Sequence, residues 1–137
     1  MTTSPGAQTA PAPSPAYTTE DKIRDFIRSY RKAYESLDID RFRLFFTEDA
    51  IELNRPFSAA LPVYQRNFGL LSALEYDITL KSWEEDEATG LVSLDGIFDI
   101  RYRTPESAWR NTQGGIRMDL AEIGGVYRIK RLDYQKE

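Results

Sequence analysis

A stretch late in the chain, GIFDIRYR at residues 96–103, alternates apolar and charged side chains. Because successive side chains of a strand point to opposite faces, one face of this stretch would be apolar and the other would hold an acid and two bases. The apolar set is Phe98, Ile100 and Tyr102. The charged set is Asp99, Arg101 and Arg103. The charged set could line an active site, or it could form cross-strand ion pairs on a solvated surface. The alternation favours the surface, because the apolar set is the natural inward face.

Histidine and cysteine are both absent from the 137 residues. The chain therefore lacks thiol nucleophiles, disulfides and thiolate metal ligands, and it lacks the commonest general base near neutral pH. Any catalysis would have to use carboxylates, Tyr, Arg, Lys, Ser or Thr. The acidic run at residues 84–87 does not indicate a metal site, because consecutive carboxylates on a turn point in different directions. No metal and no cofactor are predicted.

Charge and hydropathy limit the partners of the chain. Eighteen basic and 22 acidic residues give a net charge of −4, which argues against a broad surface for nucleic acid. No apolar run approaches about 18 residues, so no membrane insertion is predicted. The first residues also lack the pattern of a signal peptide.

Composition divides the chain into two parts. Residues 1–17 contain four prolines, four alanines and no charged side chain, which predicts a disordered linker or tail. Residues 18–137 have the mixed composition of a folded domain. A linker would tether this domain to a larger parent protein, and a tail without a partner fits the same composition.

Helical periodicity marks the start of the folded part. Apolar residues at helical spacing predict an amphipathic helix over residues 19–37, and Thr18 with Asp21 forms a capping-box pattern at its start. Asp38 is a suitable cap for a second, short helix that would turn Phe46 inward.

The remaining elements are mainly strands. A short strand is predicted at residues 50–53, and Ser58 could cap a third helix. After residue 72 the apolar period changes from 3.6 to 2, which predicts four successive strands, the last two joined by a turn at Gly124 and Gly125. The predicted order is α-α-β-α-β-β-β-β, an α+β fold.

This order, together with LDIDRFRLFFTEDA at residues 37–50 and GGVYRI at residues 124–129, resembles the nuclear transport factor 2-like superfamily. The resemblance covers about residues 19–135. It implies a cone in which a curved, mainly antiparallel sheet wraps around three N-terminal helices. The superfamily includes isomerases, dehydratases, hydrolases and non-catalytic modules, so the fold alone does not imply an activity.

The C-terminal part is most similar to accessory domains that follow a low-complexity linker in bacterial L,D-transpeptidases and other cell-envelope proteins. That similarity implies a non-catalytic domain of a bacterial protein, in the cell envelope or periplasm or in the cytoplasm. The superfamily also implies a homodimer, because its outer sheet face often pairs with a second copy.

Two enzyme types of the superfamily can be compared with the chain residue by residue. Ketosteroid isomerase-type enzymes use a tyrosine, a protonated aspartate and a carboxylate base; the first two positions fall on Tyr30 and Asp119, but the third falls near Asn54 and Arg55, which are not acids. Scytalone dehydratase-like chemistry needs histidines, and the chain has none.

Limonene epoxide hydrolase-type enzymes use an Asp-Arg-Asp set with an asparagine. The two aspartates fall on Asp99 and Asp133 and the asparagine on Asn54, but the arginine position falls on Ile97. Alternation also turns Asp99 away from the cone. The sequence therefore lacks the complete set of catalytic residues of each of these enzyme types.

We therefore expect a non-catalytic accessory domain that binds a small ligand or a protein, with an isomerase- or cyclase-type enzyme as the alternative. The expected pocket residues inside the cone are Tyr30, Tyr34, Asn54 and Asp119. The expected partner contacts on the outer sheet face are Asp99, Arg101 and Arg103. An open cavity with Asp119 buried beside Tyr30 would favour the enzyme, and a cone filled by side chains without an inward acid would exclude it.

Overall fold

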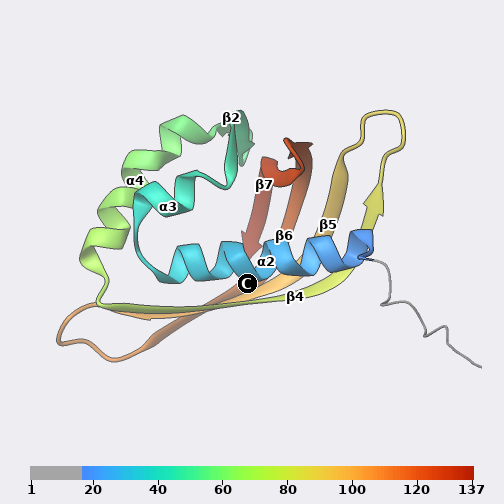
Figure 1. The fold of residues 1–137 in the computed structure, drawn as a ribbon. Helices are drawn as coiled ribbons and strands as arrows, with labels where there is room; N and C mark the ends of the chain where they lie inside the picture. The colour runs from blue at the N-terminus through green and yellow to red at the C-terminus, as the bar shows by residue number, and fades with distance from the viewer. Residues whose placement is uncertain (1–16) are drawn as a thin grey trace, which may run out of the picture.

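The structure, a computed structural model, describes residues 17–137 (Figure 1). Apart from Tyr17, the predicted linker at residues 1–17 lies outside this range, so its disorder stays a prediction.

Three helices and six strands make up the described part of the chain. The helices are α2 (Thr19–Glu35), α3 (Ile39–Arg43) and α4 (Phe57–Leu70). The strands are β2 (Phe46–Glu52), β3 (Arg55–Pro56), β4 (Ala73–Glu85), β5 (Val92–Arg103), β6 (Arg110–Ile123) and β7 (Val126–Lys136). They form one sheet in the order β3-β2-β7-β6-β5-β4, antiparallel except for the parallel pair β2 and β7.

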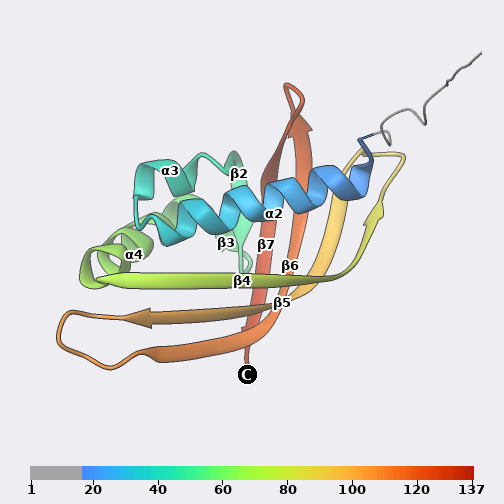
Figure 2. The ribbon, with the colours of Figure 1, turned by 60° about the horizontal axis from the view of Figure 1, so that its bottom comes forward.

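The sheet is strongly curved, and α2 lies across its concave side (Figures 1 and 2). Helices α3 and α4 gather beside the C-terminal end of α2. The apolar stripe of α2 packs on the inward residues of the strands, and together they form one core. The predicted α+β cone is therefore confirmed.

Local capping explains where the first two helices begin. The Thr18 hydroxyl accepts a hydrogen bond from the Asp21 backbone N–H, and the Asp21 carboxylate accepts one from the Thr18 backbone N–H. The Asp38 carboxylate accepts from the backbone N–H groups of Asp40 and Arg41 at the start of α3. Both caps confirm the sequence prediction.

The first strand begins earlier than predicted, at Phe46 rather than at residue 50. The reason is that the chain joins the sheet directly after α3: the Phe45 carbonyl accepts a hydrogen bond from the Ile129 N–H of β7 at 2.7 Å. Phe46 is buried as predicted, but from a strand and not from a helix.

The cap predicted for the third helix is also corrected. Helix α4 begins at Phe57 after Pro56, without a side-chain cap, so Ser58 is already inside the helix. Leu53 and Asn54 both have positive φ, and they form a tight turn that pairs Arg55 and Pro56 with the end of β2. The helix starts immediately after this small hairpin.

Candidate functional site

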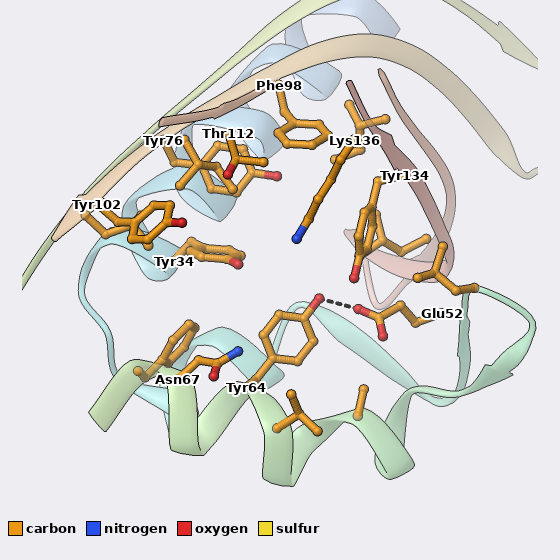
Figure 3. A pocket seen from close by; sticks show the side chains of 18 of the residues that line it. Tyr34, Glu52, Tyr64, Asn67, Tyr76, Phe98, Tyr102, Thr112, Tyr134 and Lys136 are labelled. Carbon is orange, nitrogen blue, oxygen red and sulfur yellow. Dashed lines mark hydrogen bonds between the residues drawn. The ribbon is translucent and has the colours of Figure 1, made fainter. Parts of the chain in front are cut away.

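The cone encloses a cavity of about 700 Å³ between α2, α4 and the concave side of the sheet (Figure 3). Its wall is mostly apolar, with eight aromatic residues, and is built from α2, α4 and strands β2 to β7. The aromatic lining residues are Tyr30, Tyr34, Tyr64, Phe68, Tyr76, Phe98, Tyr102 and Tyr134. The cavity is therefore open, and the inward side chains do not fill the cone.

One carboxylate faces this cavity, that of Glu52 at the end of β2. Ala50 and Glu52 are both buried and alternate with the half-buried Ile51, so the inward face of β2 ends on an acid. Only 7% of Glu52 is exposed, and it is the one buried charged residue in the described part of the chain. The Tyr64 hydroxyl of α4 donates a hydrogen bond to its Oε2 (Figure 3).

Burial of the Glu52 carboxyl raises its pKa, and hydrogen bonds from the hydroxyls of Tyr64 and Tyr134 oppose this rise. Burial likewise raises the pKa of the Tyr64 hydroxyl well above its usual value, so this hydroxyl stays protonated. Within residues 17–137, Glu52 forms no ion pair. The site is thus a buried acid that accepts a hydrogen bond from the Tyr64 phenol in a mostly apolar cavity, and it can accept a further hydrogen bond or a proton.

A β-bulge places two further polar side chains on the cavity wall. Asp119 pairs with Arg131 and Leu120 pairs with Ile129, so Lys130 is left out of the register. Before the bulge Ile129 faces inward, and after it Leu132, Tyr134 and Lys136 do. Simple alternation from Ile129 would have put these three residues on the outside.

The mouth of the cavity is lined by exposed apolar residues. Leu53, Val63 and Leu70 are 42%, 46% and 59% exposed and belong to the lining. Exposed large apolar side chains around an apolar cavity are typical of a ligand-binding mouth.

Two of the predicted pocket residues line the cavity, Tyr30 and Tyr34. Tyr30 is only 1% exposed and packs among other aromatic rings, so it belongs to the core at the base of the wall. The ring of Tyr34 lies 4.7 Å from that of Tyr76 and 5.4 Å from that of Phe68, between α2, β4 and α4.

The other two predicted pocket residues lie elsewhere. Asn54 is an exposed turn residue whose side-chain oxygen accepts a hydrogen bond from Arg131. Asp119 faces the outer side of β6, where it accepts a hydrogen bond from the Ser93 hydroxyl at 2.7 Å. The inward residues beside it are Met118 and Leu120, so strand alternation keeps Asp119 out of the cavity.

The predicted outer face is charged and largely paired. Asp99 accepts hydrogen bonds from the side-chain amides of Asn111 and Gln113. Arg101 forms an ion pair with Glu75 at 2.6 Å. Arg101 and Arg103 also lie against the ring of Trp109, at 5.0 and 5.7 Å from its centroid. Contact of Asp99, Arg101 and Arg103 with a partner, including a second copy of the chain, stays a prediction.

The sequence interpretation missed Glu52, Tyr64, Tyr134 and Lys136. Glu52 lies in the segment where an isomerase base was sought, two residues before Asn54. The sequence feature that could have revealed Glu52 is its spacing of two residues from Ala50, because such residues of a strand face the same side. Tyr64 could be assigned to the apolar stripe of the third helix, but the sequence did not reveal that its hydroxyl donates a hydrogen bond to Glu52.

Within residues 17–137 there is no group of three or more acidic, His or Cys side chains that could hold a metal ion. The same range contains no helix long and apolar enough to cross a membrane.

No family model and no curated protein matches the sequence. Solved structures do match it. Aln2 from a Streptomyces species is 16% identical with a TM-score of 0.74, over 90% of this chain and 93% of its own. A proposed scytalone dehydratase from Novosphingobium aromaticivorans is 12% identical with a TM-score of 0.76, over 86% and 83%. Bd1075 from Bdellovibrio bacteriovorus is 14% identical with a TM-score of 0.66, over 84% of this chain and 40% of its own.

Identities this low show the fold alone. Together with the curved, unclosed sheet and its three helices, these matches give the chain the nuclear transport factor 2-like fold, as the sequence resemblance implied.

Proposed function

We propose that this domain binds one small organic ligand in its cone and does so as a non-catalytic accessory domain. The observation that carries the proposal is the open cavity of about 700 Å³, which has the size and the aromatic lining of small-molecule sites. The apolar mouth residues Leu53, Val63 and Leu70 support the same function, since a solvated domain gains nothing from exposing them together.

The proposal includes a tether to a larger bacterial protein. The Pro- and Ala-rich composition of residues 1–17 supports it. The match to Bd1075 supports it too, because the shared fold there occupies only 40% of a longer chain. The similarity to accessory domains of L,D-transpeptidases and other cell-envelope proteins suggests the kind of parent.

Binding in the cavity can be tested with 2-naphthol, a neutral, flat and mostly apolar probe. We expect it to shift the backbone amide NMR signals of cavity residues such as Leu74, Thr112 and Leu132. Ala60→Trp places an indole in the cavity wall and should weaken binding by about tenfold or more, equal to about 1.4 kcal/mol.

Ala88→Trp is the matched control, because Ala88 lies in the exposed turn between β4 and β5. It should leave the affinity unchanged. Equal affinities for the Ala60→Trp variant and the wild type would show that the probe does not use the cavity.

The alternative function is an isomerase- or cyclase-type enzyme. One observation favours it: Glu52, an acid of raised pKa, faces the cavity beside the phenols of Tyr64 and Tyr134. An acid in this setting can take a proton from a carbon next to a carbonyl group, while a protonated phenol stabilises the enolate oxygen.

The enzyme function predicts a pH-dependent proton exchange on a ketone such as 2-tetralone. The base works only when Glu52 is ionised, so the exchange rate in D₂O should rise with pH through the raised pKa of Glu52, above 4.5. Glu52→Gln should lower the NMR-measured exchange rate by about 100-fold. An equal rate for the wild type and this variant, or a rate no faster than without protein, argues against catalysis and leaves the binding function intact.

A further inference from the structure

Glu52 is the only acid among the described residues that line the cavity, and its hydrogen-bonding capacity is only partly used. The residue is 7% exposed, and the Tyr64 hydroxyl donates a hydrogen bond to its Oε2 (Figure 3). A carboxylate offers about four acceptor positions, and the hydroxyls of Tyr64 and Tyr134 account for at most two of them. Because acceptors this deeply buried normally have partners, the remaining positions call for a donor from the cavity side, which a ligand can supply.

The acid is held in place by a well-packed side chain. The Tyr64 ring has its centroid 4.9 Å from that of Phe42 and 6.1 Å from that of Phe68, and both of those rings are buried. The Tyr64 hydroxyl therefore has a fixed position on α4, and its hydrogen bond fixes the Glu52 carboxylate in turn. A carboxylate that is already oriented can bind a ligand donor without first losing rotational freedom, which favours affinity.

The charges around the cavity favour a neutral group at this acid. Arg55 is directly opposite Glu52 in the β2–β3 pair, and both residues line the cavity. Opposite residues of an antiparallel pair lie on the same face, so a cationic residue neighbours the acid although the two form no ion pair within residues 17–137. A negative ligand group at this wall would be repelled by Glu52, and a positive one would be opposed by Arg55.

We propose that the ligand is a neutral molecule with an apolar, ring-containing body and a hydrogen-bond donor, a hydroxyl or an N–H, that lies against Glu52. This rests on the ligand-binding function proposed above and names the chemical class of the ligand. The aromatic lining contacts the body, and the charge-assisted hydrogen bond decides which end of the ligand lies at Glu52. A molecule of the same shape without a donor leaves the buried acceptor unsatisfied and binds more weakly.

Two neutral probes with the same rings test the donor: 2-naphthol has a hydroxyl group, and 2-methoxynaphthalene has none. By NMR titration, we expect the wild-type domain to bind 2-naphthol about tenfold more tightly, the size expected of one hydrogen bond to a charged group. Glu52→Leu removes the acceptor and should reduce this preference to less than about twofold. Glu52→Gln keeps one acceptor oxygen without the charge, so it should show a preference smaller than that of the wild type.

Glu48→Leu is the matched control, since Glu48 lies on the same strand, is exposed and is outside the cavity. This variant should keep the wild-type preference for 2-naphthol. Two charged probes test the neutral class, because 2-naphthoate and 2-naphthylmethylammonium should both bind the wild-type domain more weakly than 2-naphthol does.

Three results would each overturn the inference and leave the ligand-binding function standing. They are equal affinities of the wild-type domain for 2-naphthol and 2-methoxynaphthalene, an undiminished preference in the Glu52→Leu variant, and tighter binding of either charged probe than of 2-naphthol. If Glu52→Leu does not fold, the probe comparison in the wild type and in Glu52→Gln decides. If no probe binds the wild-type domain, both proposals are overturned.

Discussion

Replacing Tyr30 by alanine is expected to lower the free energy of unfolding by about 3–5 kcal/mol, the usual cost of deleting a buried aromatic ring. Tyr30 is 1% exposed on α2. Six other rings have their centroids within 6.4 Å of its own: Phe26, Tyr34, Phe42, Phe45, Phe46 and Tyr76. These rings come from α2, α3, β2, β4 and the segment between α3 and β2, so the cavity left by alanine would loosen contacts among all of them.

Tyr30→Phe separates the packing of this residue from its hydroxyl. Burial raises the pKa of Tyr30 well above its usual value, so its hydroxyl stays protonated. Removing the hydroxyl should therefore cost only about 1 kcal/mol. Urea unfolding measures the free energy of unfolding of the Tyr30→Ala and Tyr30→Phe variants. Titration with 2-naphthol measures how tightly each variant binds the probe. A Tyr30→Phe variant that folds normally but no longer binds 2-naphthol would show that the hydroxyl serves the ligand and not the core.

The sequence correctly predicted those features of the fold that depend on residues close together in the chain. Thr18 and Asp21 define the start of α2 by their own hydrogen bonds. Gly124 and Gly125 both adopt positive φ in the turn between β6 and β7. Regular alternation over residues 96–103 also predicted the inward face of β5 correctly, because β5 pairs with β6 without a register shift.

The site was harder to predict, because its polar residues depend on irregularities and on packing between distant elements. The bulge at Lys130 reverses the faces of β7, and its trace in the sequence is a change of apolar phase between Ile129 and Leu132 that regular alternation does not predict. Glu52 looks like a surface acid at the end of a short strand. It becomes buried only because α4 folds back over β2 and brings the Tyr64 hydroxyl to it. Asp119, chosen by local alignment, failed for the opposite reason: β6 is regular there and turns it outward.

Gly114→Ala is the second substitution for which we expect a large loss of stability, roughly 1–3 kcal/mol from overpacking. A methyl group at this position would lie 2.0 Å from the carbonyl oxygen of Gln135 and 2.9 Å from the Cα of Lys136. Both neighbours are backbone atoms of β7, so they cannot move aside as a flexible side chain could. The two strands would have to separate where the sheet closes against the cavity.

Gly115→Ala is a control one residue away. No heavy atom lies within 4 Å of its added methyl group, and neither glycine has positive φ, so the two variants differ in space and not in backbone conformation. Gly115→Ala should leave stability unchanged within about 0.5 kcal/mol or raise it slightly. Urea midpoints at an unchanged m-value measure both effects. Equal midpoints for the two variants would contradict the close approach of β6 and β7.

The close approach at Gly114 also connects stability to the proposed ligand. Gly114 pairs with Lys136, so a methyl group that displaces β7 there would move the lysine that faces the cavity. A Gly114→Ala variant that still folds should therefore bind 2-naphthol more weakly than the wild type, because Lys136 and other residues of β7 line the cavity. The Gly115→Ala variant should bind 2-naphthol like the wild type. The absence of a side chain at Gly114 would then be needed for the shape of the cavity as well as for the pairing of β6 and β7.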